Sequence, residues 1–158
     1  TCAFPDYYID DAEQLAKVLR TQVDVVLPDG TAVLNADDPL VAEMAGLCDG
    51  SVIFFGTDAR APVIAMHRVQ GGRAVFLDGT RVILAEGDQE AALMDIQAIP
   101  LTEGGTLDAQ NRNVLAAVAG AWALNVHEDL IRAGIETFGL ETSESFTEAA
   151  ASNVEASA

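Results

Sequence analysis

The chain has 158 residues, of which 50% are hydrophobic, so its length allows one domain and its composition excludes disorder of the chain as a whole. Twenty-five acidic residues against eight basic ones give a formal net charge of −17, which disfavours binding to nucleic acids and to anionic membrane surfaces. Because the sequence shows neither a membrane-spanning apolar run nor a signal-peptide pattern, we expect a cytoplasmic protein.

The first third of the chain predicts an α/β arrangement. Apolar residues at helical spacing predict a helix over residues 10–26, with Asp10 as its cap. Residues 31–35 (TAVLN) and 51–55 (SVIFF) favour β-strands, and between them Asp38 followed by a proline begins a second helix. A strand, a helix and a strand in this order are typical of a parallel sheet.

The middle of the chain predicts an antiparallel meander over about residues 62–99. Asp78-Gly79 between two β-rich runs indicates a hairpin, because both central residues of a type I′ turn need positive φ. The strand candidates, in chain order, are 62–69, 73–77, 80–85 and 93–99.

The last third predicts two helices. An Ala-rich helix covers about residues 109–124 with Asp108 as its cap, and a final helix covers about 127–138. The remaining residues are mostly Ser, Thr, Glu and Ala, so we expect a disordered tail over 140–158. The predicted organisation is therefore one domain over 1–139 and this tail.

Candidates for catalysis and for metal binding are few. Asp37 and Asp38 offer oxygen ligands of the kind that Mg²⁺ prefers, but a helix cap and a strand-to-helix turn explain them better. Neither His67 nor His127 has a partner at metal-ligand spacing. The single lysine, Lys17, does not follow a glycine-rich phosphate loop. We predict no catalytic residue and no metal ligand in this sequence.

The most informative polar cluster is Gln110-Asn111-Arg112-Asn113, at the start of the Ala-rich helix. Gln110 and Asn113 are three residues apart and share one helical face, and their amides place donors beside acceptors as the edge of a purine requires. The alternative is that these are ordinary polar residues in the first turn of a helix.

Four segments in this order resemble the Mur-ligase-like module of cyanophycin synthetase. They are 28–39 (PDGTAVLNADDP), 52–55 (VIFF), 99–105 (IPLTEGG) and 110–125 (QNRNVLAAVAGAWALN). Residues 34–39 are similar to other Mur ligases as well, whereas 99–105 and the helix with Trp122 point to the cyanophycin branch. The resemblance extends over about residues 9–138.

The resemblance implies an α/β fold, as part of a Mur-ligase-type central domain. It combines a parallel β-α-β portion with a small antiparallel meander and C-terminal helices. Enzymes of this family use ATP to phosphorylate a carboxylate, and an amine then attacks the acyl phosphate; cyanophycin synthetase polymerises aspartate and arginine in this way. ATP and Mg²⁺ are therefore the implied cofactors, and the resemblance places Gln110 and Asn113 near the adenine of ATP.

The sequence also departs from the family. The phosphate loop, the magnesium-binding Glu and His and the C-terminal domain would lie outside this segment. Aligned with the family, Leu19 stands where several relatives have a functional lysine, two residues after Lys17. The alternative is an alignment shifted by two residues, which would put Lys17 at that position. We therefore expect a chain that needs the missing N-terminal half and C-terminal domain of the ligase, or that self-associates. The alternatives are a non-catalytic structural or interaction remnant and, less favoured, a free-standing nucleotide-binding domain.

Overall fold

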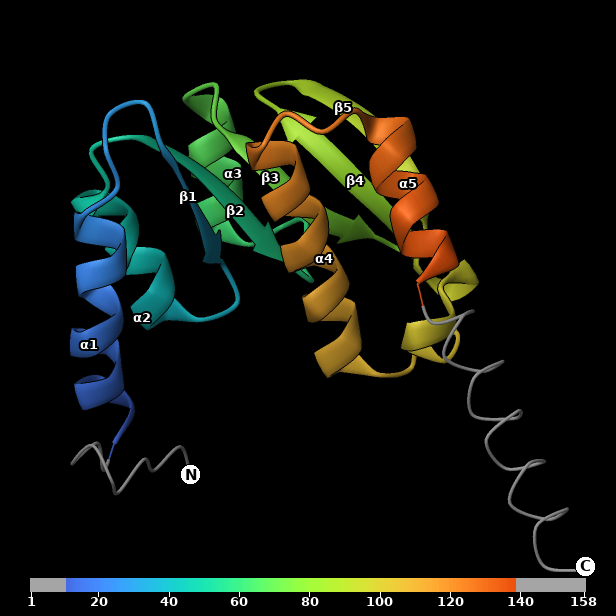
Figure 1. Cartoon of the computed structure of the whole chain (residues 1–158), viewed down its shortest axis with the longest axis horizontal. Coiled ribbons are helices and arrows are strands. Elements are labelled where there is room, and N and C mark those ends of the chain that lie inside the picture. Colours follow the sequence, from blue (N-terminus) through green and yellow to red (C-terminus); the bar gives the residue numbers. More distant parts are fainter. Residues whose placement is uncertain (1–10, 139–158) are drawn as a thin grey trace, which may run out of the picture.

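Five strands form one mixed sheet, in the spatial order β1-β2-β3-β4-β5, in the computed structural model, which describes residues 11–138 (Figure 1). The strands are β1 (Thr31–Asn35), β2 (Ser51–Gly56), β3 (Arg73–Asp78), β4 (Arg81–Glu86) and β5 (Gln89–Asp95). The first three strands are parallel, and β4 and β5 continue the sheet in antiparallel pairing. This confirms the predicted α/β class, with a parallel portion joined to an antiparallel meander.

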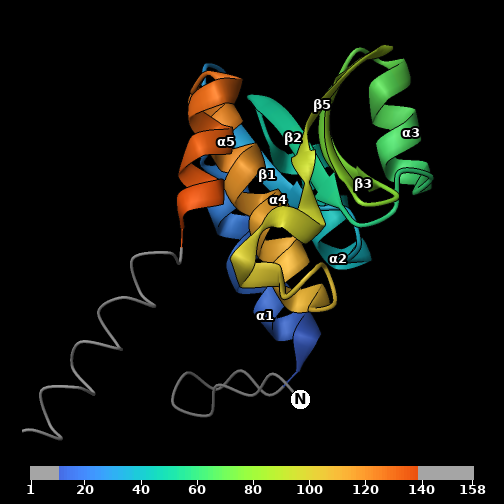
Figure 2. The ribbon, with the colours of Figure 1, turned by 90° about the vertical axis from the view of Figure 1, so that its right-hand side faces the viewer.

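Helices cover both faces of the sheet. Their bounds are α1 (Ala12–Asp24), α2 (Pro39–Ala42), α3 (Pro62–Val69), α4 (Asp108–Ala123) and α5 (Glu128–Thr137), with short 3₁₀ helices η2 (Glu43–Leu47), η3 (Ile96–Ala98) and η4 (Pro100–Thr102). Figure 2 shows α3 on one side of the sheet and α4 with α5 on the other. None of the helices in the described part of the chain is long and apolar enough to cross a membrane.

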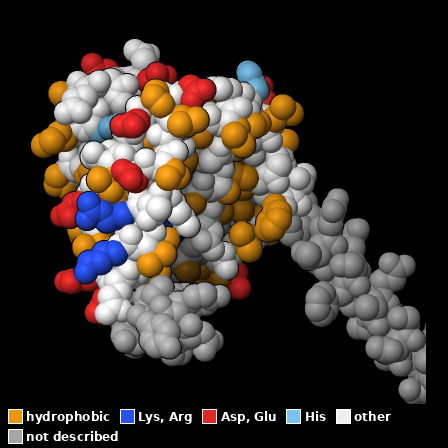
Figure 3. Space-filling model, turned by 60° about the vertical axis from the view of Figure 1, so that its left-hand side comes forward, with side chains coloured by type: hydrophobic (Ala, Val, Ile, Leu, Met, Phe, Trp, Pro, Cys, Tyr) orange, Lys and Arg blue, Asp and Glu red, His pale blue; other side chains and the backbone are white. Residues whose placement is uncertain are grey.

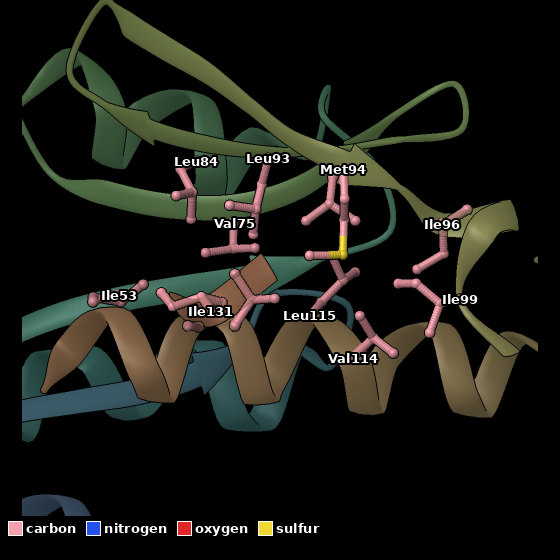
Figure 4. Close-up of a cluster of buried hydrophobic side chains, with 13 residues drawn as sticks. Ile53, Val75, Leu84, Leu93, Met94, Ile96, Ile99, Val114, Leu115 and Ile131 are labelled. Atoms are coloured by element: carbon pink, nitrogen blue, oxygen red, sulfur yellow. The ribbon is translucent and has the colours of Figure 1, made fainter. Parts of the chain in front are cut away.

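Two hydrophobic cores result, one on each face of the sheet. In β2, Ile53 faces the core under α4 and α5, whereas the next residue, Phe54, faces the core under α2 and α3. Figure 4 shows the first core, in which Val75 and Leu84 of the sheet lie opposite Leu115 of α4. A strand buried on both faces needs a continuous apolar run, which is the pattern seen in residues 52–55.

The prediction of a strand over residues 62–69 was wrong, because this segment forms α3. Pro62 occupies the first turn of this helix, where its missing N–H costs no hydrogen bond. Ile64 points into the core, while Met66 and Val69 are 67% and 85% exposed. The meander therefore covers residues 73–95 and not 62–99, and α3 is the crossover that joins the parallel strands β2 and β3.

Three predicted boundaries also change. The strand expected over 93–99 begins at Gln89, and it ends at Asp95, whose carboxylate accepts a hydrogen bond from Gln97 N at 2.9 Å and begins η3. Asp108 is the first residue of α4 and not its cap; the cap position is Leu107, which offers no side-chain acceptor.

The remaining elements agree with the sequence-based predictions within a few residues. Asp38 Oδ1 accepts a hydrogen bond from Leu40 N at 2.9 Å, which confirms the predicted cap of α2. Asp11 caps α1, and the predicted cap, Asp10, lies outside the described residues. The predicted tail over 140–158 also lies outside them, so the division into domain and tail stays a prediction.

Candidate functional site

A cavity of about 300 Å³ lies between α4, α5 and the loop that leads from β5 to α4. Its lining is apolar apart from the two amide side chains that the sequence singled out, Gln110 and Asn113. The other lining residues are Ile99, Leu101, Val114, Ala117, Gly134, Ile135 and Phe138. The sequence placed the amides correctly on one face of a helix, but it gave no signal that α5 forms the opposite wall.

The two amides are hydrogen-bonded to each other. Asn113 Nδ2 donates to Gln110 Oε1 at 3.1 Å, as expected for residues three apart on a helix. Gln110 is half-buried and Asn113 is exposed. The bond between them leaves the Gln110 amide nitrogen as a donor and the Asn113 carbonyl oxygen as an acceptor. The pair therefore presents a donor and an acceptor beside an apolar cavity.

Thr102 holds the loop that forms one wall of the cavity. Its hydroxyl oxygen, which is fully buried, lies 2.7 Å from Ile96 O and 2.8 Å from Ile99 O, and it accepts a hydrogen bond from Gly105 N at 3.1 Å. Gly105 has a φ of 80°, a conformation that favours glycine. This side chain thus fixes the position of Ile99 against α4.

Asn111 connects the same loop to α4 from the buried side of the helix. Its Nδ2 donates to Gly105 O at 2.8 Å, and its Oδ1 is buried without a hydrogen-bond partner in the described structure. Asn111 therefore positions the loop and does not line the cavity. Sequence reasoning grouped it with Gln110 and Asn113, and only the direction in which it faces separates them.

The aspartates considered as magnesium ligands have structural partners instead. The Asp37 carboxylate accepts hydrogen bonds from Thr57 N at 3.0 and 3.1 Å and from Thr57 Oγ1 at 2.9 Å, which ties the end of β1 to the end of β2. Asp38 caps α2. Within residues 11–138, no group of three or more His, Cys, Asp or Glu side chains is placed to hold a metal ion.

The two histidines also have structural contacts. His67 lies in α3 and not in a strand; its Nε2 is 3.1 Å from Val52 O, and its ring packs edge-on against Phe54 with centroids 5.0 Å apart. His127 precedes α5, and its Nδ1 accepts a hydrogen bond from Asp129 N at 3.3 Å. Both histidines therefore contribute contacts within the fold.

The side chains of Leu19 and Lys17, both in α1, have different surroundings. Leu19 packs against the core under α2 and α3, whereas Lys17 is exposed and lines a shallow hollow with Arg20. The two side chains thus lie on different faces of α1, as the rotation of about 200° between residues two apart on a helix requires.

Comparison with individual known proteins places the chain in a family, whereas no family model matches the sequence. The chain is 38% identical over 130 residues to the cyanophycin synthetase of Synechocystis sp., a match that covers 82% of this chain and 15% of that protein. The chain belongs to the cyanophycin synthetase family. The cyanophycin synthetase of Nostoc sp. is 35% identical over 136 residues, which is 86% of this chain and 15% of that protein.

A more distant match links the family to a Mur ligase. The UDP-N-acetylmuramate--L-alanine ligase of Xylella fastidiosa is 34% identical over 109 residues, which is 69% of this chain and 20% of that protein. The chain thus spans about 15% of the length of the cyanophycin synthetases that it matches, and it carries a Mur-ligase-like fold. These matches confirm the resemblance inferred from the sequence.

Proposed function

We propose that this chain is part of an ATP-dependent amide ligase that polymerises aspartate and arginine, and that Gln110 and Asn113 bind the adenine of its ATP. The observation that carries the proposal is the hydrogen-bonded amide pair beside an apolar cavity of about 300 Å³. Membership of the cyanophycin synthetase family supplies the reaction class.

The cavity suits a flat heteroaromatic base. The side chains of Leu101 and Val114 offer apolar contact to its faces. The Gln110 amide nitrogen is free to donate to a ring nitrogen of adenine, and the Asn113 carbonyl oxygen is free to accept from the exocyclic amino group. Both contacts use groups that the amide–amide hydrogen bond leaves available.

The ligase reaction needs more than a base-binding cavity. The γ-phosphoryl group of ATP passes to a substrate carboxylate, which releases ADP; an amine then attacks the acyl carbon, and phosphate leaves as the amide forms. Residues 11–138 hold no acidic or histidine cluster placed for Mg²⁺, so we assign this chain no step through the metal. Its part in the reaction is to hold and orient the nucleotide, and we expect no turnover by the chain alone.

The test is a titration of the purified chain with adenosine, AMP and ATP, followed by backbone amide resonances. We expect all three to shift the resonances of Gln110 and Asn113 with roughly millimolar Kd values within about threefold of one another, because the base provides the affinity. Asn113→Ala should weaken the binding of each by about tenfold, since one hydrogen bond to the base is lost.

The matched control is Gln89→Ala, which removes an exposed amide at the start of β5, away from the cavity. This variant should bind all three ligands as the unchanged chain does. A folded chain that binds none of them, or an Asn113→Ala variant with unchanged affinity, would contradict the proposal. The first of these results favours the alternative, a non-catalytic structural or interaction remnant of the fold.

A further inference from the structure

We propose that the C-terminal segment of this chain docks into the cavity between α4 and α5, with the side chain of Phe146 inside the cavity. This segment, residues 139–158, lies outside the part of the chain that the structure describes. The docking does not rest on the proposed function. Its consequence does, because a segment that fills the cavity competes with a nucleotide base for the same space.

The end of α5 exposes apolar surface at one wall of the cavity. Phe138 lines the cavity and is nevertheless 63% exposed, whereas Ile99 and Val114 on the other walls are buried. Aromatic rings pack well against one another in edge-to-face or offset-stacked arrangements. Phe138 therefore offers a ring surface that a second aromatic side chain in the cavity would cover.

The chain leaves the described structure at this wall. α5 ends at Thr137, and Phe138 has extended backbone angles, with φ −65° and ψ 125°. Figure 3 shows hydrophobic side chains exposed next to the point where the described chain ends. Because consecutive Cα atoms are about 3.8 Å apart, the segment that follows Phe138 starts at the edge of the cavity.

The sequence of the segment offers one side chain that suits the cavity best. Residues 139–158 are mainly Ser, Thr, Glu and Ala, a composition that cannot form a core of its own. Phe146 is the only aromatic residue among them, and the other large apolar residues are Leu140 and Val154. Since aromatic side chains bury the largest apolar area, Phe146 gains more from the cavity than either of the others.

Phe146 is close enough along the chain to return to the cavity. It follows Phe138 by eight residues, and a flexible chain of that length has an r.m.s. end-to-end distance of about 15–17 Å. A connection this short gives an effective concentration in the millimolar range or above. The contact therefore needs only a weak intrinsic affinity, of the kind that the burial of one aromatic side chain provides.

The amide pair at the edge of the cavity suits the backbone beside Phe146. The hydrogen bond from Asn113 Nδ2 to Gln110 Oε1 leaves a donor on Gln110 and an acceptor on Asn113. The peptide groups next to a docked residue offer the complementary C=O acceptor and N–H donor. An aromatic residue within a peptide segment thus matches both the apolar interior and the polar edge of the cavity.

The same segment of a second copy is a less favourable occupant. Each copy carries a formal net charge of −17, so two copies repel one another. A segment from another molecule also reaches the cavity only at the concentration of the protein in solution, without the gain that the covalent connection provides. The occupant that we propose is therefore the segment of the same molecule.

The test is methyl NMR spectroscopy of the full chain without nucleotide. The ring current of Phe146 should shift the methyl resonances of Leu101 and Val114, and Phe146→Ser should remove this shift. Nuclear Overhauser effects between the Phe146 ring and the Val114 methyl groups should be present in the unchanged chain. Val154→Ser is the matched control, because it removes an apolar side chain from the same segment, and it should leave both sets of resonances unchanged.

Adenosine titration of the same variants measures the competition. Phe146→Ser should tighten adenosine binding by about threefold or more, because the cavity no longer has to be vacated. Val154→Ser should bind adenosine as the unchanged chain does. Phe146→Leu keeps an apolar side chain of smaller area, so its affinity for adenosine should lie between those of the unchanged chain and Phe146→Ser.

Three results would overturn the proposal. The methyl resonances of Leu101 and Val114 are the same in the unchanged chain and in Phe146→Ser; Val154→Ser changes them as much as Phe146→Ser does; or their shifts grow with protein concentration, which would place the segment of a second copy in the cavity. The methyl measurement uses no nucleotide. A chain that docks its segment but binds no adenosine would therefore contradict the proposed function and support the docking.

Discussion

At the scale of single residues, Thr102 has the largest structural role near the cavity. Its buried hydroxyl contacts two carbonyl oxygens and one backbone N–H in the loop between η3 and α4. A buried polar group that loses its hydrogen-bond partner costs about 1–3 kcal/mol. The shape of the loop, and with it one wall of the candidate site, therefore depends on a residue that contacts no ligand in our proposal.

We predict that Thr102→Val lowers the free energy of unfolding by about 2 kcal/mol, because it preserves the shape of the side chain and removes the hydroxyl. Thr102→Ser keeps the hydroxyl and removes one methyl group, so it should cost about 1 kcal/mol or less. Urea unfolding followed by circular dichroism measures both. A valine variant as stable as the serine variant would show that the hydroxyl contributes little.

Residue patterns predicted the amide pair but not its surroundings. Gln110 and Asn113 are close in sequence, so helical spacing alone placed them on one face. Phe138 and Ile99 line the same cavity from segments far apart in the chain, and their approach depends on how α5 packs against α4. The burial of Asn111 could not be predicted either, because its neighbours on both sides are polar and exposed or half-buried.

At the scale of elements, the sequence-based prediction of secondary structure was wrong where a short apolar run is compatible with both a strand and a helix. Residues 62–69 are rich in apolar side chains, which is consistent with a buried strand or with a short helix. The parallel pairing of β2 with β3 settles the choice, because a parallel connection needs a crossover, and this information is not local. The polar start of β5, Gln89 and Glu90, was missed because edge strands carry polar residues.

The same substitution should have opposite effects in a helix and at the end of a strand. Gly120 lies inside α4, and a Cβ added there meets no atom within 4 Å, so we predict that Gly120→Ala stabilises the fold by about 0.5–1 kcal/mol. At Gly56, which ends β2, a Cβ would lie 2.8 Å from Asp37 Oδ1 and 3.3 Å from the side chain of Ile64.

We therefore expect Gly56→Ala to destabilise the fold by about 1–3 kcal/mol, because the carboxylate that links β1 to β2 must move. Thermal and urea unfolding of both variants provide the comparison, with the unchanged chain as reference. Two alanine variants that both stabilise the protein would contradict the packing seen around Asp37.

At the scale of the whole molecule, the dominant feature is uncompensated negative charge. The sequence carries 25 acidic and eight basic residues, and in the described part the ion pairs of arginine are Arg68–Glu90, Arg81–Asp78 and Arg132–Asp129. The Arg81–Asp78 and Arg132–Asp129 pairs are open to solvent, and exposed pairs of this kind contribute little, with a median of about 0–1 kcal/mol. Most carboxylates thus repel one another in the folded chain, and salt screens that repulsion.

We predict that raising NaCl from about 20 mM to about 300 mM increases the free energy of unfolding by on the order of 1 kcal/mol. The shorter Debye length weakens the repulsion between carboxylates. The folded state gains more from this than the unfolded state, because it holds its charges closer together. MgCl₂ at matched ionic strength should have the same effect as NaCl, since residues 11–138 hold no cluster of His, Cys, Asp or Glu placed to bind a metal ion. Urea unfolding in the two salts tests both statements. Stability that falls with NaCl would mean that attractive pairs outweigh the repulsion. A larger gain in MgCl₂ than in NaCl would reveal a cation site in this chain.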